Sequence, residues 1–232
     1  MSTGVVLIGS GPSLNRIDPR RLAGMDSIAF NRSWLAWDDW GFAPRYHACL
    51  DPSSIAIIGP EMAPVIARYP RTRFFLHRDA AGAGIAAGGN VSFCGLVEGV
   101  RFSESLATLS DFGNVGAVSM QVLNLLGYRK VLMVGVDGDY LPEKDVENDA
   151  NHFREDYARG RVPLTPQLRA RYTGHWPVVA AECARLGINA RNASPGTVLT
   201  CFDTIGFDDG LAWLTSGAAP ERGDKALREL NS

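Results

Sequence analysis

Residues 5–14 read VVLIGSGPSL, and this stretch predicts the class of fold. The four β-forming residues from Val5 to Ile8 are continuous and apolar, which predicts a buried parallel strand. The strand runs directly into the turn Gly9-Ser10-Gly11-Pro12-Ser13, where two glycines permit backbone angles and close approaches closed to other residues. N–H groups in such a turn form a concave site suited to a phosphate. The alternative interpretation is a tight strand-to-helix turn that holds no ligand.

The composition is that of a globular protein. The chain has 232 residues, 46% of them hydrophobic and 21% charged, which suffices for one large α/β domain or two very small ones. The net charge of −2 gives no electrostatic basis for binding nucleic acid. Four widely spaced cysteines indicate buried thiols rather than a disulfide frame or a zinc site.

Two features of the sequence bear on where the protein works. No apolar run approaches the roughly 20 residues that span a bilayer, so we expect no transmembrane segment. The first strand begins almost at the N-terminus and leaves no room for a signal peptide. We therefore expect a cytoplasmic protein, with peripheral association with the inner membrane and homo-oligomerisation as open options.

Strands and helices are expected to alternate, as in a mostly parallel, doubly wound sheet with helices on both faces. Strands are predicted over residues 5–8, 27–30, 46–50, 73–76, 91–94, 130–137 and 188–192. Helices are predicted over residues 19–23, 34–40, 53–69, 114–126, 177–186 and 204–214. Gly59-Pro60 is expected to interrupt the third of these helices, and Gly127 and Gly187 are expected to cap two others.

The polarity of the chain suggests one domain with a lid. Residues 138–173 are polar and carry few periodic apolar positions, which is typical of a partly helical excursion tied to function. Residues 1–216 are predicted to form a single Rossmann-like domain that includes this lid. Residues 217–232 are predicted to be a flexible tail.

Polar residues at the carboxyl ends of the strands are candidates for a site, because ligands of open parallel sheets bind there. Each has a simpler explanation as a helix cap or a turn residue, and their coincidence at one edge favours a site. The candidates after the strands are Ser10, Ser13, Asn31, Asp51, Asp137, Asn192 and Ser194.

The predicted lid holds the candidates for catalysis. His152 lies in its polar part, and a histidine is the usual proton acceptor for a hydroxyl nucleophile; His175, beside Trp176, is its competitor. Asp137 and Asp139 are spaced D-x-D, a pattern that can hold a divalent ion on nucleotide phosphates. They are equally consistent with a catalytic carboxylate pair or a solvated turn.

The order of these motifs resembles bacterial sialyltransferases with a Rossmann-like domain. The similarity lies in G-x-G-P-S-L at the first strand, Asn31 after the second, Asp51-Pro52 after the third, and the segment GAVSMQVLNLLGYRKVLMVGVD from Gly116 to Asp137. The resemblance implies that the first turn and the small residues opening the helix at Gly116 bind a cytidine nucleotide-sugar donor. It also implies that a lid histidine is the base, that tyrosines contact the donor phosphate, and that no metal is needed.

On this resemblance, individual roles are assigned to residues of the chain. Tyr140 and Tyr157 would donate to the leaving phosphate, and His152 would take the acceptor proton. The donor-binding set is Gly9, Ser10, Gly11, Pro12, Ser13, Asn31, Asp51, Asn114, Gly116 and Asp137. The chain departs from the family pattern because Ser10 and Asp51 stand where those enzymes have asparagine, and Gly138-Asp139 precede Tyr140.

The same features also resemble the MptE-like (6-hydroxymethylpterin diphosphokinase-like) domain, which occurs in motility-associated flagellin glycosylation factors. NASPGTVLTCF, residues 192–202, is similar to that group in particular. This resemblance implies an alternative function, a diphosphokinase with ATP on the first turn and Mg²⁺ on Asp137 and Asp139.

The leading hypothesis is a glycosyltransferase that moves a sugar from a nucleotide-sugar to a hydroxyl of a glycan or protein. A third hypothesis is a nucleotide-binding module without catalytic activity. A dehydrogenase is disfavoured, because the third glycine of the dinucleotide motif is missing and Asn31 replaces its acidic residue.

Overall fold

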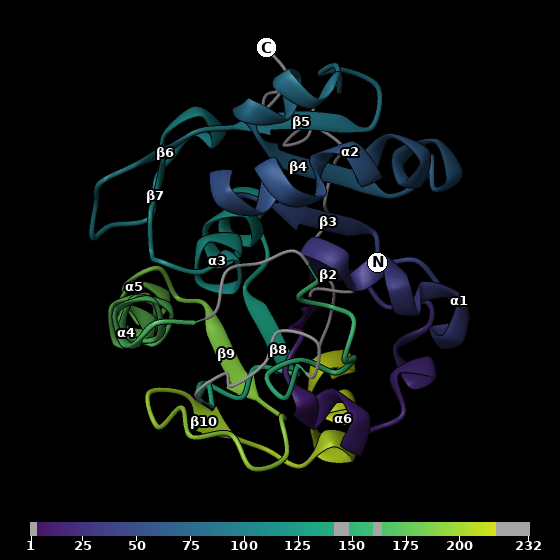
Figure 1. Ribbon diagram of the computed structural model, residues 1–232. Coiled ribbons are helices and arrows are strands. Elements are labelled where there is room, and N and C mark those ends of the chain that lie inside the picture. Colours follow the sequence, from purple (N-terminus) through teal and green to yellow (C-terminus); the bar gives the residue numbers. More distant parts are fainter. Residues whose placement is uncertain (1–3, 142–148, 160–163, 217–232) are drawn as a thin grey trace.

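An eight-stranded sheet forms the centre of the computed structural model, which describes residues 4–141, 149–159 and 164–216 (Figure 1). Its strands lie in the order β10-β9-β8-β1-β2-β3-β4-β5, and every neighbouring pair is parallel. The strands are β1 (Gly4–Ile8), β2 (Ser27–Phe30), β3 (Tyr46–Cys49), β4 (Arg73–His77), β5 (Val91–Cys94), β8 (Lys130–Val134), β9 (Asn189–Asn192) and β10 (Asp203–Thr204). A separate pair, β6 (Leu96–Val97) and β7 (Leu109–Ser110), lies outside it. The predicted α/β fold with a mostly parallel sheet is confirmed.

Both faces of the sheet are buried under helices, which explains the continuous apolar sequence of its strands. On β1, Val5 and Leu7 belong to one core, with residues of α3 and α5. Val6 and Ile8 belong to the other, with residues of α1, α2 and α6. The helices are α1 (Trp37–Trp40), α2 (Pro52–Arg68), α3 (Val115–Leu125), α4 (Pro166–Gly174), α5 (Trp176–Arg185) and α6 (Phe207–Thr215).

Short 3-10 helices connect several strands and helices. They are η1 (Pro12–Arg16), η2 (Pro19–Leu22), η3 (Asn31–Ala36), η4 (Arg78–Ala83) and η5 (Leu106–Thr108). The predicted helix over 19–23 is η2, and the one over 34–40 is divided between η3 and α1. The lid predicted over 138–173 contains α4, while its residues 142–148 and 160–163 lie outside the described part of the chain, as does the tail 217–232.

The topology reverses at β1. From β1 the chain builds strands outward through β2, β3, β4 and β5, and it then returns through α3 to place β8 on the other side of β1. The carboxyl ends of β1 and β8 therefore border a topological switch point, which is where open α/β sheets bind ligands. The first turn, residues 9–13, lies at this point.

The prediction that Gly59-Pro60 interrupts the helix expected over residues 53–69 is wrong. α2 runs from Pro52 to Arg68 with Pro60 and Pro64 inside it. Proline costs the helix one backbone hydrogen bond, and the burial of Ile55, Ile58 and Met62 against the sheet offsets that loss. Gly59 serves close packing, because a Cβ there would come within 2.9 Å of the Ala83 side chain on η4.

Two further boundaries differ from the sequence-based expectation. β8 ends at Val134 and not at residue 137, because Gly135 has φ 67° and turns the chain out of the sheet. The last helix begins at Phe207, and the residues before it form the edge strand β10. The expected caps Gly127 and Gly187 are confirmed, with φ 80° and 67°.

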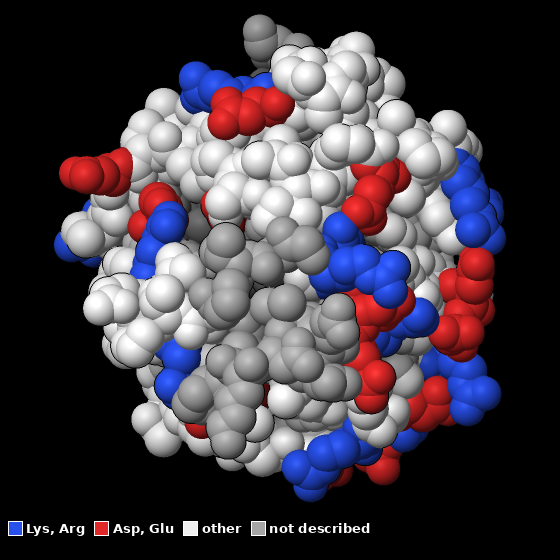
Figure 2. Space-filling view, viewed as in Figure 1, with Lys and Arg blue, Asp and Glu red and all other residues white. Residues whose placement is uncertain are grey.

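The surface and the cysteines match an ordinary globular chain. On the face shown in Figure 2, acidic and basic side chains lie next to one another along the rim of the molecule. All four cysteines are free, with Cys49, Cys94 and Cys183 buried, and burial raises the pKa of the Cys183 thiol to about 12. None of the described helices combines the length and apolar character needed to cross a membrane.

Candidate active site

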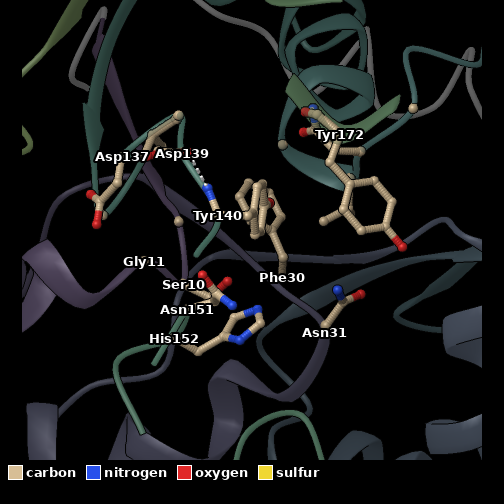
Figure 3. Close-up of a pocket in the computed structure, with 18 of the residues that line it drawn as sticks. Ser10, Gly11, Phe30, Asn31, Asp137, Asp139, Tyr140, Asn151, His152 and Tyr172 are labelled. Carbon is tan, nitrogen blue, oxygen red and sulfur yellow. Dashed lines mark hydrogen bonds between the residues drawn. The ribbon is translucent and has the colours of Figure 1, made fainter. Parts of the chain in front are cut away.

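A pocket opens at the switch point, beyond the carboxyl ends of β1, β2 and β8 (Figure 3). The N-terminal ends of α3 and α5 contribute to its lining, as do Gly138, Asp139, Tyr140, Asn151, His152 and Tyr172 of the predicted lid. Its lining residues are Gly9, Ser10, Gly11, Phe30, Asn31, Asp51, Ser54, Gly113, Asn114, Val115, Gly116, Gly135, Val136, Asp137, Gly138, Asp139, Tyr140, Asn151, His152, Tyr172 and Trp176. Most of the predicted site residues are among them; Pro12, Ser13, Tyr157, His175, Asn192 and Ser194 are not.

The first turn does not form the phosphate cradle that the sequence predicts. The N–H of Gly9 donates to the Val134 carbonyl (2.7 Å), and that of Gly11 donates to the Gly135 carbonyl (2.8 Å). Ser13 donates its N–H to an Asp137 carboxylate oxygen (3.0 Å). Within the described residues, only Ser10 of this turn keeps an N–H without an acceptor, since Pro12 has none.

Asp137 is part of the reason why the turn contains glycine. Its carboxylate accepts from the Ser13 hydroxyl and N–H, and it packs against Gly11, where a Cβ would lie 2.7 Å from the carboxyl carbon. Asp139 is the second acid of the D-x-D pattern, and its Oδ1 accepts the Tyr140 N–H (2.7 Å). No group of three or more potential metal ligands occurs among the residues that the structure describes.

The N-terminus of α3 borders the pocket and offers backbone N–H groups there. Asn114 caps this helix by accepting the Ala117 N–H (2.8 Å), and its amide donates to the Tyr172 carbonyl (2.7 Å). The first N–H groups of a helix have no acceptor within the helix and carry its positive dipole end. Those of Val115 and Gly116 belong to residues that line the pocket. Together with the Ser10 N–H, they can bind a phosphate.

Asn31 and Asp51 lie on the pocket from the β2 and β3 side. The Asn31 side chain is 7% exposed, and its Oδ1 is buried without a hydrogen-bond partner. Asp51 caps α2, because its carboxylate accepts from the Ser53 N–H (3.0 Å) and hydroxyl (2.7 Å). Asn31 thus presents a polar group with no partner among the described residues, whereas Asp51 is already hydrogen-bonded.

His152 lines the pocket as part of a carboxylate–histidine pair. Its Nδ1 lies 2.6 Å from Oδ2 of Asp149, and both side chains are buried. Asp149 also accepts the Asn151 N–H (2.9 Å), which fixes its orientation. If Nδ1 donates to the carboxylate, the proton-accepting atom of the ring is Nε2. Figure 3 shows His152, Asn151 and Asn31 along one side of the pocket, with the rings of Phe30, Tyr140 and Tyr172 near them.

Tyr157 has a structural position and does not face the pocket. It is 1% exposed, its hydroxyl donates to the Phe30 carbonyl (3.1 Å), and its ring stacks on His152 at 4.4 Å. This placement does not match the predicted contact with the donor phosphate. Tyr157 instead packs against the imidazole ring of His152.

The segment that holds His152 is hydrogen-bonded to the first turn, to η1 and to η3. The Phe153 N–H donates to the Ser10 carbonyl (2.8 Å), and the Asn15 amide donates to the Phe153 carbonyl (2.9 Å). Arg32, which is buried, pairs with Glu61 and donates to the carbonyl oxygens of Tyr157 and Arg159. The orientation of His152 is therefore linked to the first turn and to α2.

His175 lies close to the pocket without lining it. Its Nδ1 is 3.4 Å from the Arg171 carbonyl, and its ring packs on Phe112 with centroids 6.3 Å apart. Its sequence neighbours Tyr172 and Trp176 both line the pocket. It remains the second candidate for the base.

Several lining residues were not found from the sequence. Tyr172 was missed, and its ring lies 5.7 Å from that of the predicted Tyr140 at the pocket. Asp149, which orients His152 from outside the lining, was also missed. The spacing of Asp149 and His152, three residues apart, was the available signal for that pair. Phe30 is the last residue of β2. It was missed because only polar residues at the carboxyl ends of the strands were considered as candidates. The other missed residues are Ser54, Gly113, Val115, Gly135, Val136, Gly138, Asn151 and Trp176.

The fold resembles two glycosyltransferase structures. The MAf glycosyltransferase from Magnetospirillum magneticum AMB-1 aligns with all of this chain at 14% identity and a TM-score of 0.56, and the chain spans 37% of that enzyme. The sialyltransferase CstII from Campylobacter jejuni, solved in complex with the substrate analogue CMP-3FNeuAc, aligns with all of this chain at 12% identity and a TM-score of 0.51, over 99% of its own length. No family model matches the sequence, and no curated protein matches it. At these identities the likeness shows the fold.

Proposed function

We propose that this chain is a glycosyltransferase that uses a nucleotide-sugar donor. The observation that carries the proposal is that His152, paired with Asp149, lines the same pocket as the N-terminus of α3. The His152 imidazole can accept a proton from an acceptor hydroxyl, and the N-terminal N–H groups of α3 can stabilise a leaving phosphate. The two glycosyltransferase neighbours support the proposal, since CstII is described with a cytidine nucleotide-sugar analogue.

In the proposed reaction, an acceptor hydroxyl attacks the anomeric carbon of the donor. The new bond joins the acceptor oxygen to that carbon, and the bond between the carbon and the phosphate oxygen breaks. His152 takes the hydroxyl proton on Nε2, and the Asp149 carboxylate stabilises the imidazolium that forms. Negative charge develops on the leaving phosphate, and three donors stabilise it by hydrogen bonding: the N–H groups of Val115 and Gly116 and the Tyr140 hydroxyl.

The proposal requires no divalent metal. The Asp137 carboxylate accepts two hydrogen bonds from Ser13, and Asp139 accepts one from the Tyr140 backbone. Both acids of the D-x-D pattern therefore have structural partners already. The diphosphokinase hypothesis needs Mg²⁺ on these two residues, and nothing in their contacts favours it over the glycosyltransferase.

Ligand binding provides the first test. Purified protein is heated with CMP-, UDP-, GDP- and ADP-sugars and with ATP, each in EDTA and in Mg²⁺. A ligand that binds only the folded state raises the midpoint temperature of unfolding. At a concentration 100 times its Kd, it adds about 2.7 kcal/mol to the free energy of unfolding. We expect a nucleotide-sugar, with CMP-sugars first, to act in EDTA. A shift by ATP in Mg²⁺ alone would support the diphosphokinase, and no shift by any nucleotide-sugar would overturn the proposal.

Hydrolysis of the bound donor tests the base without a known acceptor, because water can take the place of the acceptor hydroxyl. We expect His152→Ala to slow release of the nucleotide by about 10²–10⁴-fold and to change the donor Kd by no more than a few-fold. His175→Ala is measured in parallel. If His175→Ala is the inactive variant, the base is His175 and the assignment of His152 is wrong. Binding with no turnover by the wild type would support the module without catalytic activity.

A further inference from the structure

Asn31 has an unusual backbone conformation at the floor of the pocket. Its φ of 45° is the only positive φ of a residue other than glycine in the described chain. Asparagine enters this left-handed region more readily than most residues, but at a cost. Asn31 is the first residue of η3, so its carbonyl has left the sheet and can accept a second hydrogen bond besides that of the helix.

His47 provides the donor for this hydrogen bond. Its Nε2 lies 2.7 Å from the Asn31 carbonyl oxygen. A carbonyl can only accept, so Nε2 carries the proton and Nδ1 is the unprotonated nitrogen of the ring. Burial holds the pKa of His47 down to about 4, against a weaker opposing effect of this hydrogen bond, and the ring is neutral at physiological pH.

The surroundings of His47 are those of an apolar core. The side chain is fully buried on β3, with the rings of Trp34, Trp37 and Phe74 at 5.2–5.7 Å. Its Nδ1 has no hydrogen-bond partner. Leaving a buried polar atom unpaired is unfavourable, and a phenylalanine would fill such a space without that cost. The contact that a histidine adds here is the one to Asn31.

The Asn31 amide is the group that this contact orients. Its Oδ1 is buried without a partner, and the residue lines the pocket. In Figure 3 the amide lies on the same side of the pocket as His152. Rotation of the Asn31 backbone out of the left-handed region would move this amide together with the carbonyl.

We propose that His47 is a positioning residue, which holds the backbone of Asn31 in the left-handed conformation so that the Asn31 amide faces the ligand. That the ligand is a nucleotide-sugar rests on the proposed function. The conformational part concerns the free protein and does not depend on it.

The test uses two substitutions of His47 and one of Asn31. His47→Phe keeps a ring and removes the N–H donor, whereas His47→Gln keeps a donor. Asn31→Gly removes the amide and tolerates a positive φ. We expect His47→Phe to weaken CMP-sugar binding about tenfold, the size of one modest interaction, and His47→Gln to stay within about threefold of the wild type.

The Asn31→Gly background distinguishes positioning from general damage to the fold. If His47 acts through Asn31, adding His47→Phe to Asn31→Gly leaves the Kd unchanged. An equal tenfold loss in both backgrounds would overturn the proposal, as would a His47→Phe protein that binds like the wild type.

Crystal structures of the unliganded variants test the conformational part directly. We expect Asn31 to leave the left-handed region in His47→Phe and to stay in it in His47→Gln. An Asn31 that keeps its positive φ in His47→Phe overturns the proposal. If His47→Phe does not fold, His47→Leu and His47→Gln form the comparison. If the wild type binds no nucleotide-sugar, the proposed function fails, and these structures still decide the role of His47.

Discussion

At the scale of single residues, Gly9 is placed where the chain allows no side chain. A Cβ on Gly9 would overlap the Gly135 carbonyl and come within 2.9 Å of the Val136 side chain. The Gly135 carbonyl oxygen that a Cβ on Gly9 would meet also accepts the Gly11 N–H. Moving the two backbone segments apart would therefore break that hydrogen bond. The glycines at the end of β1 therefore allow β1 and the segment after β8 to approach closely.

We expect Gly9→Ala to lower the free energy of unfolding by about 2 kcal/mol or more, as overpacking in a well-ordered interior does. Urea unfolding followed by circular dichroism measures the change. Gly82→Ala is the matched control, because a Cβ at Gly82 meets no atom within 4 Å. Equal stability of the two variants would show that the close approach at Gly9 is not required.

Residue types at the site could be predicted from the sequence, but their hydrogen-bond partners could not. Ser10, Asn31, Asp137, Tyr140 and His152 all line one pocket, as the strand-end argument and the resemblance anticipated. The N–H groups of the turn are engaged by β8 and the residues after it, more than 120 positions away in sequence. Local patterns contain no information on such pairings, so the sequence could not show that the N–H groups of Gly9, Gly11 and Ser13 already have acceptors.

At the scale of elements, a buried carboxylate joins α5 to the loop that precedes β7. Glu182 is 2% exposed and bonds Arg185 on its own helix, the Phe102 N–H (2.9 Å) and Arg101 (2.6 Å). The Arg185 side chain, with the Phe102 N–H and Arg101, holds the pKa of Glu182 down to about 2 from an ordinary 4.5, against desolvation, which raises it. The carboxylate form is therefore favoured by folding.

This lowered pKa predicts how stability changes with pH. A group with a depressed pKa in the folded state stabilises the protein fully above its unfolded pKa near 4.5, and the contribution is lost as the pH falls toward 2. We expect Glu182→Gln to lose about 3 kcal/mol at pH 7 and less than half of that at pH 3.

Urea unfolding of both proteins at the two pH values measures the effect of Glu182. Glu104→Gln, which replaces an exposed glutamate of the same loop, is the control and should stay near the wild type throughout. A deficit of Glu182→Gln that is constant with pH would mean that the loss comes from packing rather than from the charge.

The boundaries of elements were harder to predict than their existence. Most strands and helices occur within a few residues of the predicted ranges, because apolar runs and glycine caps report on local burial and local turns. α2 passes through Pro60 because tertiary packing outweighs the local penalty, and β8 stops at Gly135 because the chain must turn toward the pocket. Both outcomes depend on contacts with distant parts of the chain.

At the scale of the whole molecule, two cores share one sheet. Leu7 and Ile8 are adjacent on β1 and fully buried, yet Leu7 belongs to the core with α3 and α5 and Ile8 to the core with α1, α2 and α6. The alternation of side chains along a strand places them on opposite faces. Because β1 lies between β2 and β8, neither core can open without loss of the central strand pairings.

This arrangement predicts that damage to either core destabilises both. We expect Leu7→Ala and Ile8→Ala each to lower the free energy of unfolding by about 3 kcal/mol, as large-to-small substitutions in a core do.

Two buried thiols report on the two faces: Cys183 belongs to the Leu7 core and Cys49 to the Ile8 core. Thiol labelling in increasing urea, read for each cysteine by peptide mass spectrometry, should show both thiols exposed at one midpoint, and each variant should shift both by the same amount. A Leu7→Ala protein that exposes Cys183 at lower urea while Cys49 keeps the wild-type midpoint would show that the two faces unfold separately. The sheet would then not act as the cooperative unit that its topology implies.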